Sequence, residues 1–574
     1  PIYSWGEKLT NAARTGYTPD DFFETGYVTT NSVTLSGGTE KNQMFFSAAS
    51  VNSEGIIPNN LYDRYNFTFR NTSHFLKDRL RVDVGANYIV QKDQNMTNQG
   101  VYSNPLVSAY LFPRGDSFEA AKIFERWDPA RKIAVQYWPQ GEGGDLRMQN
   151  PYWIAYRNPR NTDKKRYMAN VSIAFDILPW LNVSGRAKVD NTNSIFTQKL
   201  YASSNTTITE GSTQGHYTEI RNTDEQIYAD VMVNINKTFA DNKFSLVANV
   251  GASINDTKSK ELSYRGPIRE VGIPNMFTVF DLDKEKSRPQ KYGWQEQTQS
   301  IFASVEMGYK SMLYLTVTGR NDWASQLAGS PQRSFFYPSV GLSWLPTVTF
   351  DMPEAFTYLK LRASFSSFPR FLTTPTYPYD ETNQQWLPTT FRPIEQLYPE
   401  RTKTWEIGID ARLWNDLRLS ASWYRADTNN QTFQPTVSTS SGYSSMYVQT
   451  GNVRNTGIEA SLGYGHTWGS FSWDTNFTFS WNKNEVTELM DGLTDPLTNE
   501  PLKDRLEIKG LGKAKYIIKK GGTLGDLYTT SNLKYDENGY VQIDRNGNLV
   551  TTDVGEDIYL GSVFPDYNLA WRND

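Results

Sequence analysis

The chain contains the segment Phe471-Ser-Trp-Asp-Thr-Asn-Phe-Thr-Phe-Ser-Trp481. Its aromatic residues occupy alternate positions, with Thr475 as the one interruption, and polar residues fill the positions between them. A period of two is the signature of a β-strand with one apolar and one polar face. Repeated around a closed sheet, an apolar outside and a polar inside allow a β-barrel to sit in a lipid bilayer. The segment therefore indicates a strand of an antiparallel, up-and-down transmembrane barrel.

The same alternation recurs along the chain, whereas helical periodicity is nearly absent. It is found at residues 80–88, 171–176, 181–189, 227–235, 244–253, 359–365, 405–413, 417–424 and 458–464. A strand of a soluble β-sandwich also has one apolar and one polar face, so alternation alone leaves that alternative open. Many of these runs, however, approach the ~9–11 residues of a tilted membrane strand and exceed the ~5–6 residues of an average strand. Strand length thus favours the barrel.

The connections between the predicted strands fall into two classes. Short turns are expected at residues 77–79, 178–180, 240–243, 414–416 and 467–470, and long links at 91–166, 190–225, 254–297, 366–403, 427–450 and 484–526. Short periplasmic turns at one rim and long extracellular loops at the other describe an outer-membrane barrel. Trp180, Phe239, Trp414 and Trp468 lie beside the short turns, as expected for an interfacial aromatic girdle.

Composition excludes several classes of protein. The chain has 574 residues, a formal net charge of −4 and a mean hydropathy of −0.59. No stretch approaches the ~20 apolar residues of a membrane helix, and no basic surplus indicates a nucleic-acid partner. The chain has no Cys, and its three His residues lie far apart in sequence. We therefore expect no disulfide, no cofactor and no metal centre.

Charged residues occupy the polar faces of the predicted strands. An Arg or Lys that faced lipid at the middle of the bilayer would cost roughly 2–4 kcal/mol, which assigns these faces to a water-filled lumen. The predicted lumen-lining residues are Arg81, Asp83, Arg186, Lys188, Asp230, Lys360, Arg362, Glu406, Asp410, Arg412 and Glu459. For each of them, a solvated interior charge is the alternative to a specific role in transport.

Several short motifs appear in the same order as in one known family. They are Ser36-Gly-Gly-Thr-Glu-Lys41, Gly55-Ile-Ile-Pro-Asn59 with Arg64, Thr318-Gly-Arg-Asn-Asp-Trp-Ala-Ser325, Phe336-Tyr-Pro-Ser-Val-Gly-Leu-Ser-Trp344, Leu359-Lys-Leu-Arg-Ala-Ser364, Pro399-Glu-Arg-Thr-Lys-Thr-Trp-Glu-Ile-Gly-Ile409, Gly451-Asn-Val-Arg-Asn-Thr-Gly-Ile-Glu459 and Trp481-Asn-Lys-Asn484. Together they span nearly the whole chain. The sequence resembles the SusC-type (SusC/RagA-like) branch of TonB-dependent outer-membrane transporters of Bacteroidota.

The resemblance implies a 22-stranded barrel that is closed by an N-terminal plug. It also implies a TonB-engaging segment before the plug, a SusD-like lipoprotein that covers the extracellular mouth, and a dimer of transporter–lid pairs. We expect residues 1–30 to be the end of the plug and residues 31–574 to form the barrel. The plug itself, the TonB-engaging segment and the last strands are then absent from the chain, which we interpret as a fragment.

Motifs for catalysis and for calcium binding are missing. Gly510-Leu-Gly-Lys513 lacks the spacing of a phosphate-binding loop, and Ser438-Thr-Ser-Ser-Gly-Tyr443 is a polar loop rather than a nucleophile elbow. Asp536-Glu-Asn-Gly539 and Asp544-Arg-Asn-Gly547 have the spacing of hairpin turns and not of an EF-hand loop. We expect no enzyme and no bound metal.

Aromatic residues in the long loops are the candidate ligand contacts, because flat rings stack on sugar faces and also grip peptide side chains. They are Trp127, Trp138, Tyr152, Trp153 and Tyr156 in the 91–166 link, and Tyr377, Tyr379 and Trp386 in the 366–403 link. The alternative is that such rings pack loop against loop, or against a partner protein.

The resemblance and the strand pattern together predict an importer in the outer membrane of a Gram-negative cell. It would move oligosaccharides or short peptides inward with a SusD-like lipoprotein, and TonB would supply the energy through the region that precedes Pro1. Outer-membrane lipid would surround the barrel. A passive porin is one alternative, and a secreted β-rich protein that binds or hydrolyses glycans is another.

Overall fold

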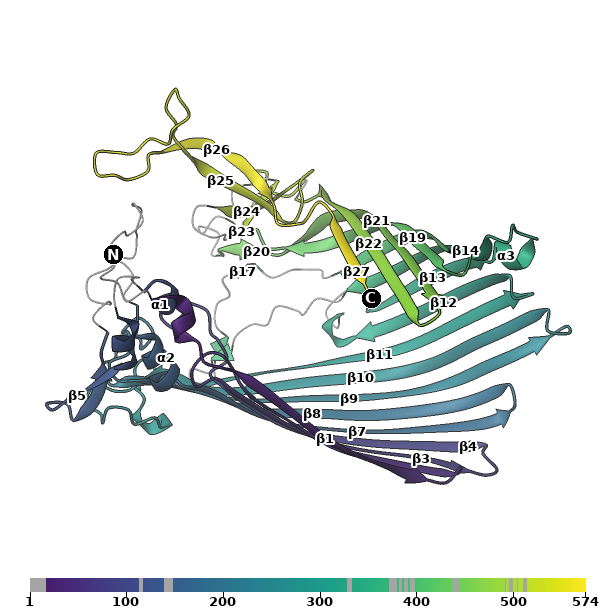
Figure 1. Ribbon diagram of the computed structural model, residues 1–574, viewed down its shortest axis with the longest axis horizontal. Helices are drawn as coiled ribbons and strands as arrows, with labels where there is room; N and C mark the ends of the chain where they lie inside the picture. The colour runs from purple at the N-terminus through teal and green to yellow at the C-terminus, as the bar shows by residue number, and fades with distance from the viewer. Residues whose placement is uncertain are drawn as a thin grey trace. The chain divides into compact units, whose positions relative to one another are not determined.

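The computed structural model of the chain describes residues 17–112, 117–138, 148–327, 333–370, 379–380, 385–386, 391–392, 398–435, 437, 443–490, 492–494, 499–502, 504–508 and 514–574. Within these residues, seventeen strands belong to one sheet (Figure 1). They are β1 (Tyr27–Gly38), β2 (Asn42–Glu54), β3 (Leu61–Phe75), β4 (Leu80–Gln94), β7 (Arg160–Leu178), β8 (Leu181–Tyr201), β9 (Gly215–Phe239), β10 (Phe244–Pro267), β11 (Gln290–Tyr309), β12 (Leu313–Ala324), β13 (Ser334–Trp344), β14 (Phe356–Arg370), β18 (Glu400–Leu413), β19 (Leu417–Phe433), β21 (Val448–Trp468), β22 (Phe471–Glu488) and β27 (Asn568–Asn573).

The chain divides into two compact units. The first runs up to Ile177 and adds Val183–Val231 and Ile254–Gln297, and the second holds Leu178–Asn182, Met232–Ser253 and the chain from Thr298 onward. Strands β7 to β11 contribute residues to both. Within the first unit, β1, β2, β3, β4 and β7 pair in that order, each antiparallel to the next. The prediction of an antiparallel sheet of sequential strands is confirmed.

Register in the second unit aligns apolar residues on one face of the sheet. Strands β11, β12, β13, β14, β18, β19, β21, β22 and β27 pair antiparallel in that order. On β22, Phe477 lies opposite Leu462 of β21 and Trp571 of β27. Phe471 and Phe477 are 62% and 45% exposed. A β-sandwich would bury this face against a second sheet, so its exposure argues against the sandwich alternative.

The predicted short turns are confirmed. Only 179–180 separate β7 from β8, only 414–416 separate β18 from β19, and only 469–470 separate β21 from β22. Trp414 and Asn415 have φ values of 51° and 64°, in the left-handed region. Positive φ at the centre of a tight hairpin matches the right-handed twist of the flanking strands, which explains why the strands can reverse there within three residues.

The strands extend further toward the long loops than the alternation predicts. Strand β9 begins at Gly215 rather than at residue 227, and β10 continues to Pro267 rather than to residue 253. The expected long links 190–225 and 254–297 were therefore wrong at their boundaries. The added segments carry polar residues on both faces, so the period-two signal disappears while the backbone ladder continues.

The 91–166 link forms a small structure of its own in the first unit. It contains α1 (Pro105–Tyr110), η2 (Phe118–Lys122), the hairpin of β5 (Glu125–Asp128) and β6 (Ile133–Gln136), and α2 (Pro151–Arg157). Together with η1 (Pro19–Phe22), these elements enclose a cluster that we call the loop core: Tyr17, Phe22, Ala109, Phe112, Phe118, Ala121, Trp138 and Tyr152. The rings of Tyr17 and Phe118 stack with centroids 4.2 Å apart. No described helix combines the length and the apolar character that a membrane crossing requires.

A second apolar cluster lies in the second unit. It joins the loop-side ends of β19, β21 and β22 to a separate four-stranded sheet through Phe433, Val448, Val453, Val486, Leu489, Met490, Leu506 and Ile518. That sheet consists of β23 (Arg505–Ile508), β24 (Lys515–Lys519), β25 (Asp526–Leu533) and β26 (Thr551–Ser562). The remaining short elements are η4 (Val279–Asp281), η5 (Ser325–Leu327), α3 (Pro346–Thr349), β15 (Tyr379–Asp380), β16 (Gln385–Trp386), β17 (Phe391–Arg392) and β20 (Ser445–Met446).

Candidate functional site

The polar face of the sheet carries networks of paired charges. In the second unit, the Nη1 atom of Arg362 lies 2.7 Å from Oε1 of Glu406, and its Nε atom lies 3.6 Å from Oδ2 of Asp410. Lys360 lies directly opposite Asp410 in the register of β14 and β18. Their neighbours on the same strands, Phe365 and Ile407, belong to the opposite face. The alternation thus places these predicted lumen-lining charges away from the exposed apolar residues.

Two carboxylates on the polar face of the first unit are buried. The side chain of Asp230 is 0% exposed and lies 3.0 Å from Nη2 of Arg186. Asp190 accepts hydrogen bonds from Nε and Nη2 of Arg166 at 2.8 and 2.6 Å, and Lys188 adds a contact at 3.5 Å. A buried charge is tolerated only when it is paired and hydrogen-bonded. These carboxylates therefore fix the positions of the guanidinium groups along this face.

The other predicted lumen residues are less constrained. Arg81 and Asp83 form a contact of 2.9 Å with side chains 56% and 26% exposed. Arg412 lies opposite Arg418, which binds Asp474, and Glu459 lies opposite a serine on each neighbouring strand. Positions of this kind need no role beyond a solvated charge.

One charged cluster was not among the predicted site residues. Arg320 donates to Oδ1 of Asp322 at 2.7 Å and to Oγ of Ser300 at 2.7 Å, and the hydroxyl of Tyr337 donates to the other carboxylate oxygen. Asp322 is only 5% exposed. The signal was present in the sequence, because Arg320 and Asp322 belong to the motif at 318–325 and Tyr337 to the motif at 336–344. The register of β12 and β13 brings the two motifs together.

The predicted ligand-contact aromatics of the 91–166 link separate into buried and exposed residues. Trp138, Tyr152 and Trp153 are 8%, 7% and 0% exposed. Trp153 donates its indole N–H to Oγ of Ser204 at 2.9 Å, in the neighbouring loop between β8 and β9. These three rings therefore pack loop against loop, as the alternative interpretation has it. Trp127 and Tyr156, at 66% and 38% exposed, remain available to a ligand.

The side chains of the candidate aromatic residues in the 366–403 link lie outside the part of the chain that the structure describes. Tyr377 lies outside the described residues. The backbones of Tyr379 and Trp386 pair in the two-residue strands β15 and β16, but the description does not extend to their side chains. Their role in binding stays a prediction.

Asn150 holds the N-terminus of α2 against the rest of the loop structure. Its side-chain oxygen accepts a hydrogen bond from the backbone N–H of Tyr152 at 2.9 Å, as the N-cap of a helix does. Its amide nitrogen donates to the backbone carbonyls of Ala121 and Tyr137 at 2.7 and 3.1 Å. The cap thus ties the helix to two neighbouring segments of the loop. Burial raises the pKa of the Tyr152 hydroxyl well above its ordinary value.

Two charged residues, Glu125 and Arg126, precede Trp127 on its hairpin. Arg157 of α2 makes two hydrogen bonds with Glu125, at 2.7 and 2.9 Å, which fixes β5 beside the helix. The guanidinium carbon of Arg126 lies 3.4 Å from the centre of the Tyr137 ring. An exposed aromatic ring beside immobilised polar groups can stack on a ligand and hydrogen-bond to it.

The acidic turns near the end of the chain have the geometry of hairpin turns. Oδ1 of Asp536 accepts from the backbone N–H groups of Asn538 and Tyr540, both at 2.9 Å. Asp544 repeats this pattern, and its hydrogen bonds hold the pKa of its carboxyl below the usual range. Gly539 and Gly547 have φ values of 83° and 82°, which favour glycine. Nowhere in the described part of the chain do three His, Asp or Glu side chains gather as metal ligands would.

A barrel sheet with one exposed apolar face and one charged polar face defines a class of membrane β-barrel. The chain belongs to the TonB-dependent receptor β-barrel family, since the family model "TonB dependent receptor-like, beta-barrel" matches residues 115–572. Barrels of this family are outer-membrane proteins of Gram-negative bacteria. The family consists of receptors and transporters rather than enzymes, which agrees with the sequence-based expectation.

The relatives of the chain include a SusC-type receptor, in agreement with the resemblance that the sequence motifs indicated. The chain is 24% identical to the TonB-dependent receptor P3 of Formosa agariphila and 22% identical to the TonB-dependent receptor SusC of Bacteroides thetaiotaomicron. The two alignments cover 97% and 96% of this chain. The chain spans 56% of the length of each relative. Its fold is similar to that in the structure of the RagAB peptide importer in the closed-closed state, with a TM-score of 0.73 and 19% identity over 95% of this chain and 60% of that one.

Proposed function

We propose that the natural protein is a TonB-dependent importer that carries oligosaccharides or short peptides across the outer membrane. The observation that supports this most directly is the sorting of side chains on the sheet. Exposed apolar residues such as Ile407 (59% exposed) alternate with paired charges such as Glu406. In a bilayer, the first face is stable against acyl chains and the second lines a hydrated interior.

The ligand would be captured at the loop end of the barrel. Trp127 supplies an exposed ring there, and Tyr156 stacks on Phe124 at 5.6 Å while leaving more than a third of its surface open. The ion pair of Arg157 and Glu125 joins α2, which carries Tyr156, to β5, which carries Trp127. Aromatic rings on a rigid support bind sugar faces or peptide side chains without covalent chemistry.

A lid and an energy source complete the proposed cycle. A SusD-like lipoprotein would cover the loop end, and TonB would supply the energy for transport. Relatives of the SusC type support the lid, and the similarity in fold to RagAB, a peptide importer, supports peptides as one class of ligand. The proposed assembly is a dimer of transporter–lid pairs.

Uptake in cells tests the proposal. The gene in its full natural length, expressed with its neighbouring lipoprotein gene in a strain that lacks its own SusC-type proteins, should accumulate in the outer membrane. Labelled oligosaccharides and peptides should then enter in a manner that requires TonB. Uptake that persists without TonB would show a passive porin, and recovery in the soluble fraction without detergent would contradict membrane insertion altogether.

A further inference from the structure

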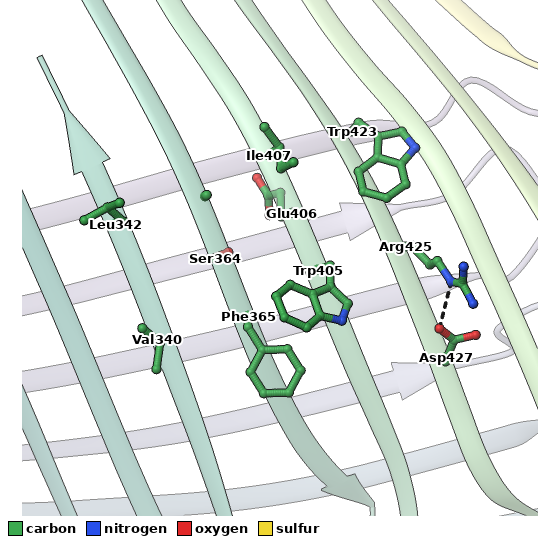
Figure 2. A pocket seen from close by; sticks show the side chains of 11 residues that line it. Val340, Leu342, Ser364, Phe365, Trp405, Glu406, Ile407, Trp423, Arg425 and Asp427 are labelled. Carbon is green, nitrogen blue, oxygen red and sulfur yellow. Dashed lines mark hydrogen bonds and ion pairs between the residues drawn. The ribbon is translucent and has the colours of Figure 1, made fainter. Parts of the chain in front are cut away.

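A groove of about 790 Å³ lies on the exposed apolar face of the second unit (Figure 2). Its lining is mostly apolar, with Ser364 and Glu406 as polar members, and the rings of Phe365 and Trp405 meet there with centroids 4.6 Å apart. Trp423 lies on the next strand, and the ion pair of Arg425 and Asp427 closes one end of the groove. A charged pair beside an apolar groove, on the face opposite the lumen charges, has no part in the transport pathway proposed above.

The apolar face changes to a cationic one at a similar level on four neighbouring strands. Toward the long loops, Trp405 of β18 is followed on its own face by Lys403, and Trp423 of β19 by Arg425. On β21, Ile458 gives way to Thr456 and then Arg454, and on β22 Trp481 gives way to Lys483. Residues two apart share a face of a strand. We call Lys403, Arg425, Arg454 and Lys483 the cationic rim.

The rim has more positive than negative charge. Arg425 and Arg454 share one carboxylate, that of Asp427, at 2.9 and 2.7 Å. Lys483 lies 3.5 Å from Glu485. Four cations against these two carboxylates leave an excess of two positive charges. The Arg425 and Arg454 side chains are 41% and 36% exposed, so both guanidiniums have hydrogen-bonding capacity left for an anion.

The first unit provides an internal comparison. A pocket of about 690 Å³ lies there at the loop-side end of β4 and β7, lined by Tyr88 and Tyr167. On the apolar face, the cations Lys92 and Lys165 are matched by Asp163, which lines the pocket, and by Asp63, which lies opposite Lys92. Lys164 also lines the pocket, but it is the direct neighbour of Lys165 and belongs to the other face of the strand. The charges on the apolar face of these strands therefore balance. A cationic excess is not a general property of the apolar boundary of this chain.

We propose that the groove and the cationic rim together bind a phosphate-bearing anionic lipid of the membrane leaflet on the long-loop side. The inference rests on the proposed outer-membrane location. Arginine guanidiniums match the geometry of phosphate oxygens and bind them through paired hydrogen bonds. Phe365, Trp405 and Trp423 would line the path of an acyl chain directly below the headgroup. A free phosphate ion would fill the rim but leave the groove exposed to lipid.

Lipid retention by the full-length protein tests the inference. The protein is inserted into nanodiscs that contain equal amounts of phosphatidylglycerol and phosphatidylcholine, then extracted gently, and its retained lipids are counted by native mass spectrometry. The wild type should retain phosphatidylglycerol preferentially. The variant Arg425→Gln/Arg454→Gln should lose that preference by about fivefold or more, because each basic residue near an anionic surface adds attraction of that order.

Matched variants separate the site from a general attraction between basic residues and lipid. Lys92→Gln/Lys165→Gln removes the same number of cations from the first unit and should leave retention unchanged, whereas Asp427→Asn should increase it. Equal losses in both double variants, or retention without headgroup preference, would overturn the inference. Failure of the wild type to enter nanodiscs would instead contradict the proposed function.

Discussion

Trp405 and Arg425 lie directly opposite each other on β18 and β19, with their side chains on the same exposed face of the sheet. Two residues further from the loops, Ile407 lies opposite Trp423. On the same face of the sheet, Arg425 thus lies only two residues along β19 from the apolar pair of Ile407 and Trp423. Aromatic and basic residues are typical of the level where hydrocarbon meets headgroups. The pair therefore marks the loop-side boundary of the apolar band on this part of the barrel.

Neighbouring residues of β19 test which face meets lipid. Ala421 lies opposite Ile409 on the apolar face, whereas Ser422 lies opposite Gly408 on the polar face. Ala421→Arg should lower the free energy of unfolding in bilayers by about 2–4 kcal/mol, since it places a cation near mid-bilayer. Ser422→Arg should change it little, because Glu459 lies opposite on β21. Guanidinium titration of the barrel in vesicles measures both, and equal costs would contradict the assignment of the faces.

Arg186 and Asp230 test the buried charges of the polar face. Arg186→Ala leaves the fully buried Asp230 carboxylate without its guanidinium and should cost about 3–5 kcal/mol of unfolding free energy. Arg81→Ala should cost under about 1 kcal/mol, because that pair is exposed. The double variant Arg186→Leu/Asp230→Leu should recover most of the loss. If the single and double variants are equally unstable, the loss of stability comes from packing and not from the unpaired Asp230 charge.

Trp153 tests the stability of the loop structure. Its ring is fully buried and its indole N–H binds Ser204, so Trp153→Phe should cost about 1 kcal/mol and Trp153→Ala about 3–5 kcal/mol locally. Hydrogen exchange at the amides of α2 measures this directly. The barrel strands of the second unit should keep their protection. Unchanged exchange in α2 for Trp153→Ala would show that the ring does not support the loop.

Trp127 tests the proposed ligand contact. Because its side chain is 66% exposed on the β5–β6 hairpin, Trp127→Ala should leave the exchange of α2 amides unchanged. It should weaken ligand binding by about 1–2 kcal/mol, because the variant lacks the aromatic ring that would otherwise contact the ligand. Calorimetric titration with the transported ligand measures the affinity, and Tyr110→Ala, an exposed aromatic elsewhere in the same loop, is the control. Equal losses of ligand affinity in the two variants would show that Trp127 does not contact the ligand.

The sequence predicted the barrel correctly where lipid constrains it. On β22 the apolar face must be continuous, so the alternation from Phe471 to Trp481 survives in the sequence and gives both the strand and its register. Beyond the apolar band no such constraint acts. The first residues of β9, from Gly215 onward, therefore show no period of two, although they belong to the strand.

The site was predicted less completely, for a reason that Trp153 illustrates. A tryptophan in a long polar loop has the same local sequence context whether it packs inside the loop or faces a ligand. Only the loop fold, with Asn150 capping α2 and the aromatic cluster around Phe118, decides between the two. Arg320 and Asp322 show the converse, since their motif was recognised but the buried network with Tyr337 required the strand register.

Glu507 predicts a pH dependence confined to the small sheet of the second unit. A hydrogen bond from Lys515 holds the pKa of the Glu507 carboxyl below its ordinary value of 4.5. A lowered pKa in the folded state means that the ion pair stabilises β23 on β24 at neutral pH, and that this contribution is lost as the pH falls below 4.5 through the folded value. Hydrogen exchange at Ile517 and Ile518 should therefore accelerate at low pH relative to amides of β21. Glu507→Gln should show the faster exchange already at neutral pH and no further acid dependence, whereas an acid dependence that persists in this variant would place the titrating group elsewhere.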